Sequence, residues 1–214
     1  MSSPLIKICG LSTAQTLETT ITAGVEMAGF VFFEKSPRHL SLQTAEALGV
    51  QAQGRIRKVA LTVDAIDAEL DTIVSALRPD LLQLHGSETP ARVAAVKARF
   101  GLPVMKAIGV ETAADLEAIS SYEGVADILL FDAKPPPDAA VPGGAGVAFD
   151  WKLLRNISAA NWMLSGGLNP ENVAKALELT GARAVDVSSG VESARGVKDI
   201  ARIKAFVAAA RSLT

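Results

Sequence analysis

Several polar side chains that could take part in chemistry stand directly after short apolar runs of the sequence. Cys9 ends one run and Asp132 ends another, while Arg38 and His85 follow two more. A thiol and a carboxyl can act as base and acid in proton transfer. A guanidinium pairs with a carboxylate through two parallel hydrogen bonds. These residue types therefore suit acid–base chemistry on an anionic molecule.

Two segments rich in glycine and serine follow the last two apolar runs. Glycine lets the backbone approach a ligand closely, so N–H groups in such loops can hold a phosphate without lysine or arginine. Ordinary tight turns are the alternative interpretation of either segment alone. We expect a phosphate site formed by Gly166, Gly167, Ser188, Ser189 and Gly190, with Asp186 just before the second segment.

Each candidate also has an ordinary structural interpretation. A lone cysteine is commonly a small buried hydrophobe, and an aspartate after a strand often caps the next helix. Arg38 could be a solvated charge, and His85 could be a hydrogen-bonded turn residue. Their joint placement after successive apolar runs is what favours the functional interpretation.

The positions of these residues depend on an alternation of apolar runs with amphipathic segments. The runs predict strands over Leu5–Cys9, Met27–Phe33, Lys58–Val63, Leu81–Leu84, Val104–Ile108, Ala126–Phe131, Trp162–Leu164 and Ala184–Val187. The amphipathic segments predict helices over Thr13–Thr22, Leu42–Leu48, Ile66–Leu77, Thr89–Phe100, Ala113–Ser120, Phe149–Leu154, Glu171–Thr180 and Asp199–Arg211. Asn169-Pro170 is typical of a helix start, with an asparagine cap and proline in the first turn.

This alternation predicts an α/β protein with a parallel sheet, and the number of repeats favours a closed (β/α)8 TIM barrel, one domain over residues 1–214. In a barrel of this kind chemistry occurs at the carboxyl ends of the strands, and phosphate binds after the seventh and eighth. Alternation along the first strand places Lys7 and Cys9 on the interior face. Because a nearby ammonium favours a thiolate, we expect Lys7 to lower the pKa of Cys9.

The least regular stretch runs from Lys134 to Gly146, with three consecutive prolines and the run Gly143-Gly144-Ala145-Gly146. It lies between the sixth strand and the sixth helix. We interpret it as a mobile lid over the site, and a domain linker is the alternative.

Composition narrows the classes of partner. The chain has 214 residues, a formal net charge of −2, and 5% aromatic residues, whereas nucleic-acid binding needs a basic face or an aromatic platform. No apolar run reaches the roughly 18 residues of a membrane span, and the amino terminus lacks a signal-peptide pattern. One cysteine allows no internal disulfide, which favours the cytoplasm. We also find no P-loop, dinucleotide fingerprint or zinc-ligand spacing, so we expect no cofactor and no metal.

Six segments along the chain form a specific set of motifs: Lys7–Leu11, Phe32–Arg38, Gln83–Gly86, Phe149–Trp151, Ser165–Val173 and Val185–Glu192. In this order the set resembles N-(5′-phosphoribosyl)anthranilate isomerase of tryptophan biosynthesis. The resemblance implies a single-domain TIM barrel without metal or cofactor. Its reaction would be an Amadori rearrangement, converting the phosphoribosylamine of anthranilate into the 1-deoxyribulose phosphate.

The same resemblance implies roles for individual residues. Cys9 would be the general base and Asp132 the general acid, Arg38 would hold the anthranilate carboxylate, and Asp186 would contact the substrate amine. His85 is expected among the substrate-binding residues. An acid must keep its proton near neutral pH, so we expect burial or Asp186 to raise the pKa of Asp132.

The sequence departs from the family pattern at two positions. Ala133-Lys134 follows the expected acid where the family often has threonine or serine, and Ala145 stands in the glycine run where the family often has threonine. Both lie on the expected lid, so they bear on its motion and on fine substrate contacts.

Two other functions stay open. Another phosphosugar isomerase on the same barrel, such as the histidine-pathway aldose–ketose isomerase, would have an aspartate in place of Cys9. A catalytically silent phosphometabolite-binding or redox-sensing barrel would still bind phosphate after Cys9 is replaced. In each case we expect a small-molecule partner, no nucleic acid and no membrane. We expect a monomer, with a homodimer as the alternative.

Overall fold

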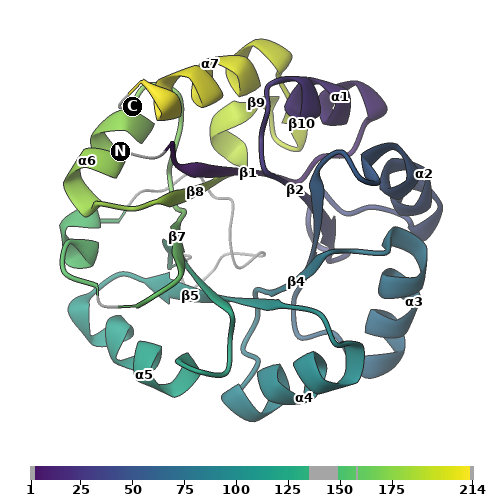
Figure 1. Cartoon of the computed structure of the whole chain (residues 1–214), viewed down its shortest axis with the longest axis horizontal. Coiled ribbons are helices and arrows are strands. Elements are labelled where there is room, and N and C mark those ends of the chain that lie inside the picture. Colours follow the sequence, from purple (N-terminus) through teal and green to yellow (C-terminus); the bar gives the residue numbers. More distant parts are fainter. Residues whose placement is uncertain (1–2, 135–148, 158, 213–214) are drawn as a thin grey trace.

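The computed structural model describes residues 3–134, 149–157 and 159–212, and eight parallel strands close into a barrel at its centre (Figure 1). Each strand pairs with the next along the chain, and β1 closes the barrel on β8 in the register that places Lys7 beside Asp186. The predicted (β/α)8 architecture is confirmed. The strands are β1 (Leu5–Cys9), β2 (Met27–Phe32), β3 (Arg57–Thr62), β4 (Leu81–Leu84), β5 (Val104–Val110), β6 (Ile128–Ala133), β7 (Trp162–Leu164) and β8 (Ala184–Val187).

Helices surround the barrel as an outer ring (Figure 1). They are α1 (Ala14–Thr22), α2 (Leu42–Ala52), α3 (Asp67–Leu77), α4 (Pro90–Phe100), α5 (Ile119–Tyr122), α6 (Val173–Thr180) and α7 (Ile200–Arg211), with 3₁₀ turns η1 (Ala113–Ala118), η2 (Trp151–Leu154) and η3 (Ser189–Val191). None of the helices in the described part of the chain is long and apolar enough to cross a membrane.

Four predicted helices differ from the structure by two residues or more, and one of them, expected over Leu42–Leu48, continues to Ala52. The segment Phe149–Leu154 forms only the turn η2, and Ala113–Ser120 is mostly the 3₁₀ turn η1. The helix expected from Glu171 begins at Val173. Asn169 does not cap it but accepts a hydrogen bond from the Glu171 N–H, in the turn before the helix.

A short hairpin between β8 and α7 has no counterpart among the predicted elements. It consists of β9 (Glu192–Ala194) and β10 (Val197–Lys198), which pair antiparallel. Figure 1 shows it between α1 and α7, and residues of all three elements line one cavity. Gly196 at its tip has φ 83° and packs so closely on the Pro37 carbonyl that a Cβ would lie 2.8 Å from that oxygen. The hairpin is therefore fixed against the loop after β2.

The strand alternation divides the core into an inner and an outer layer. Ile6 and Ile8 are fully buried in the larger apolar cluster, together with helix residues such as Leu17. Lys7 is also fully buried, and Cys9 packs with apolar side chains of a separate cluster. This arrangement matches the prediction that Lys7 and Cys9 face the barrel interior.

Candidate active site

Cys9 lies at the carboxyl end of β1 and is only 4% exposed. A Cβ at Gly29 on the adjacent strand would lie 3.0 Å from its Sγ, so the glycine leaves just enough room for the thiol. Deeper in the barrel, Lys7 Nζ lies 2.8 Å from Asp186 Oδ1. The structure thus places the thiol above a buried ion pair.

The acidity of Cys9 differs from the sequence-based expectation. Burial raises the pKa of the thiol above its ordinary value, and the charges of Lys7 and Lys198 offset this only in part. The prediction that the pKa of Cys9 is lowered is therefore wrong, although the charge of Lys7 does act in the predicted direction. For Lys7 itself burial acts downward, but Asp186 and Cys9 outweigh it and raise the pKa of the ammonium, which stays charged.

Asp132 lies at the end of β6 and is 7% exposed. Its Oδ2 is 3.3 Å from His85 Nε2, and its Oδ1 accepts the N–H of Ala133. His85 Nδ1 is 2.9 Å from the Gln83 amide nitrogen. The aspartate therefore belongs to a chain of polar side chains inside the barrel mouth, and none of its contacts in the described residues caps a helix.

Gln83 was not among the predicted site residues. It is fully buried, and its Oε1 has no hydrogen-bond partner among the described residues. The available signal was a polar residue at an inward position of a strand that is otherwise apolar, two residues before His85.

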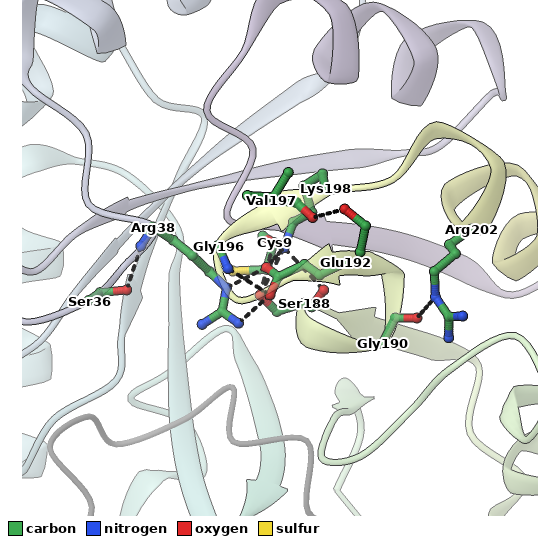
Figure 2. A network of polar contacts seen from close by, with 11 residues as sticks. Cys9, Ser36, Arg38, Ser188, Gly190, Glu192, Gly196, Val197, Lys198 and Arg202 are labelled. Carbon is green, nitrogen blue, oxygen red and sulfur yellow. Dashed lines mark hydrogen bonds and ion pairs between the residues drawn. The ribbon is translucent and has the colours of Figure 1, made fainter.

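Arg38 is buried and paired, so its interpretation as a solvated charge is wrong. Its Nε and Nη2 donate to the two carboxylate oxygens of Glu192 at 2.7 and 2.8 Å. Lys198 Nζ lies 2.5 Å from Glu192 Oε1. Figure 2 shows both cations converging on Glu192 beside Cys9 and Ser188. Glu192 ends the motif Val185–Glu192 but had no predicted role, and Lys198 was not among the predicted site residues.

The ionisation of Glu192 follows from these two contacts. Burial acts to raise the pKa of this carboxyl, but the hydrogen bond from Arg38 and the charge of Lys198 prevail and lower it to about 2. Burial lowers the pKa of Lys198, and Glu192 opposes that change only in part. Glu192 is therefore a carboxylate throughout the neutral range.

The two loops expected to bind phosphate lie next to each other. Gly166 and Gly167 have φ 86° and 67°, a backbone conformation that favours glycine. In the loop after β8, Gly190 contacts the carbonyl of Leu168, in the loop after β7, so closely that a Cβ at Gly190 would overlap it. The loops after β7 and β8 thus form one surface, as the predicted phosphate site requires.

Ser188 connects this surface to the thiol. Its hydroxyl donates to the Cys9 carbonyl at 3.1 Å, and Lys198 Nζ donates to the Ser188 carbonyl at 3.0 Å. Ser189 begins the turn η3. Asp186, expected to contact the substrate amine, is paired with Lys7 in the structure.

The expected lid falls almost wholly outside the described residues. Lys134 and Ala133 are described, and Ala133 ends β6. The three prolines, the glycine run and Ala145 belong to residues 135–148, which the structure does not describe.

Comparison with known proteins identifies the family to which the chain belongs. Residues 6–209 match the family model described as N-(5′phosphoribosyl)anthranilate (PRA) isomerase. A protein of Nitrobacter hamburgensis named N-(5′-phosphoribosyl)anthranilate isomerase is 60% identical over 98% of this chain and 94% of its own length.

Solved structures give the same result. A Thermotoga maritima structure, described as monomers generated from a dimeric phosphoribosylanthranilate isomerase, has a TM-score of 0.83 and 32% identity, covering 97% of this chain and 98% of the other. A second phosphoribosylanthranilate isomerase, in complex with reduced 1-(o-carboxyphenylamino)-1-deoxyribulose 5-phosphate, has a TM-score of 0.84 and 31% identity over the same shares. The chain belongs to the N-(5′-phosphoribosyl)anthranilate isomerase family.

Proposed function

We propose that this protein converts N-(5′-phosphoribosyl)anthranilate into 1-(2-carboxyphenylamino)-1-deoxyribulose 5-phosphate, the Amadori rearrangement of tryptophan biosynthesis. The observation that carries the proposal is a buried thiol and a buried carboxyl at the same end of one barrel, on β1 and β6, in a member of this family. The complex of a related enzyme with a reduced form of this ribulose phosphate supports the choice of substrate.

Asp132 is the general acid of the first step. Its carboxyl gives a proton to the ribose ring oxygen, the bond from that oxygen to C1′ breaks, and the amine lone pair forms a C1′=N Schiff base. The contact with His85 at 3.3 Å fixes the direction of the carboxyl group. Proton transfer requires such a group within hydrogen-bond reach of the ring oxygen.

Cys9 is the general base of the second step. The thiolate removes the C2′ proton, and the electron pair of that C–H bond forms the C1′=C2′ bond of an enolamine while the nitrogen becomes neutral. A proton then returns to C1′, the C2′ hydroxyl loses its proton, and the ketone results. Because burial favours the thiol form, the ammonium of Lys7 contributes by stabilising the thiolate that this step needs.

Binding uses the two ends of the substrate. Arg38 holds the anthranilate carboxylate, a pairing for which a guanidinium has the right geometry. Backbone N–H groups of the adjoining loops hold the phosphate; the residues are Gly166, Gly167, Ser188, Ser189 and Gly190. His85 and Asp186 complete the set of substrate-binding residues that we propose.

The test is a fluorescence assay that follows the loss of phosphoribosylanthranilate. We expect Cys9→Ala and Asp132→Asn each to reduce kcat by about 10²-fold or more, the effect usual for acid–base groups. Arg38→Ala should mainly raise KM. Near wild-type turnover by either of the first two variants would contradict the assignment. A barrel that only binds phosphometabolites would show no turnover in the wild-type protein.

A further inference from the structure

Glu192 stands between two cations that come from different parts of the chain. Arg38 belongs to the loop after β2, whereas Lys198 ends the hairpin after β8. The side chains of Arg38, Glu192 and Lys198 are 5%, 4% and 1% exposed. Among the described residues, two cations and one anion thus lie buried together.

The contact with Glu192 fixes the plane of the Arg38 guanidinium. Two parallel hydrogen bonds, from Nε and from Nη2, leave the group little freedom to rotate. A long arginine side chain held by one bond, or by water, would have to be ordered when the substrate binds. The carboxylate of Glu192 therefore settles the direction of the guanidinium before binding.

Glu192 is itself held on two further sides. Lys198 Nζ contacts its Oε1, and the N–H of Gly196 donates to its Oε2 at 3.0 Å. Lys198 also donates to the carbonyl and the hydroxyl of Ser188, at 3.0 and 3.2 Å. Figure 2 shows this continuous network running from Arg38 to the residues around Cys9. Hydrogen bonds thus connect the guanidinium of Arg38, through Glu192 and Lys198, to the loop after β8 that we assign to the phosphate.

We propose that Glu192 and Lys198 form a clamp that orients Arg38, and that this clamp makes the enzyme select an aromatic amine bearing a carboxylate. The inference rests on the function proposed above and adds two positioning residues to it. Neither residue needs to touch the reacting atoms. Glu192 orients Arg38 by direct contact and Lys198 does so through Glu192, so loss of Glu192 should weaken recognition of the carboxylate more than the chemical step.

The experiment compares two substrates. Steady-state kcat and KM are measured with phosphoribosylanthranilate and with phosphoribosylaniline, which lacks only the carboxylate. For Glu192→Gln we expect KM for the first substrate to rise about tenfold, which corresponds to about 1.4 kcal/mol of binding free energy, with a much smaller change in kcat. KM for phosphoribosylaniline should stay at the wild-type value.

A double-mutant cycle distinguishes a clamp from a general structural effect. In an Arg38→Ala background, Glu192→Gln should change KM no further, because the residue through which it acts is already gone. Glu18→Gln is the matched control, since Glu18 on α1 pairs at the exposed surface with Arg55, in the turn after α2, through two short contacts. Its kinetic constants should equal those of the wild type.

The outcomes separate the clamp from the proposed function. An unchanged ratio of kcat/KM for the two substrates in Glu192→Gln would overturn the clamp alone, as would additive effects of Glu192→Gln and Arg38→Ala. Lack of turnover by the wild-type protein would overturn the proposed function instead. Melting temperatures show whether each variant folds. If Glu192→Gln does not fold, Glu192→Asp replaces it: this variant keeps the charge but shortens the side chain, so it should also raise KM for phosphoribosylanthranilate.

Discussion

Lys7→Met removes a buried ammonium on which both the stability of the barrel interior and the acidity of Cys9 depend. Lys7 is fully buried, and its Nζ lies 2.8 Å from Asp186 Oδ1. Methionine fills a similar volume, so the main loss is the charge, and Asp186 remains buried without its cation. Removing one partner of a buried pair costs about 3–5 kcal/mol. We expect the free energy of unfolding in urea at neutral pH to fall by this amount.

The same substitution should make Cys9 a weaker acid. Lys7 is the strongest of the influences that oppose burial at the thiol, so without it the pKa of Cys9 rises further. The chain has one cysteine, so thiolate absorbance in the ultraviolet reports on Cys9 alone, with Cys9→Ser as the blank. The titration of Lys7→Met should lie at higher pH than that of the wild type.

A second variant separates the two effects. Lys7→Met/Asp186→Leu replaces the whole ion pair with apolar groups, a change that is often neutral or stabilising. It should recover most of the lost stability but not the acidity of the thiol, because Lys7 influences Cys9 more strongly than Asp186 does. The reasoning is refuted if Lys7→Met unfolds at the wild-type urea concentration, or if its thiol titrates at the wild-type pH.

Three further predictions concern the residues around the site. Gly29→Ala should lower kcat about tenfold or more, because small displacements of a catalytic group are costly. The added Cβ would lie 3.0 Å from the Sγ of Cys9 and crowd it. Steady-state kinetics measure the effect, and an unchanged kcat would count against the prediction. Gly190→Ala should raise KM and lower the melting temperature, since its Cβ would overlap the Leu168 carbonyl. Glu192, with its pKa lowered from 4.5 to about 2, contributes stability above pH 4.5 that is lost as the pH falls toward 2. In urea unfolding at stepwise pH, Glu192→Gln should therefore lose less stability than the wild type across that range.

The barrel strands were predictable because each is a short apolar run buried on both faces. Leu5–Cys9, Leu81–Leu84, Trp162–Leu164 and Ala184–Val187 have the same bounds in the sequence analysis and in the structure. The segment Phe149–Leu154 was mistaken for a helix because its apolar residues suit either a helix or a turn. It is too short for periodicity to decide between them.

The partners of Arg38 could not be predicted from the sequence. Arg38 and Glu192 are 154 positions apart, and only the closure of the barrel brings them together. The strands of the hairpin have three and two residues, too few to show alternation. The prediction that the pKa of Cys9 is lowered was wrong for a related reason, since the neighbouring lysine is visible in the sequence while the degree of burial is not.

Charge in the barrel mouth is arranged in local pairs, and this explains how an acidic chain can take an anionic substrate. Lys7 faces Asp186 and Lys198 faces Glu192, each at side chains no more than 5% exposed. A buried pair is screened little by salt, and it adds no net charge to the surface. In the proposed function, the positive charge of Arg38 acts on the substrate from inside the site. In the binding mode that we propose, recognition depends on the orientation of one guanidinium and of backbone N–H groups, so it needs no basic surface.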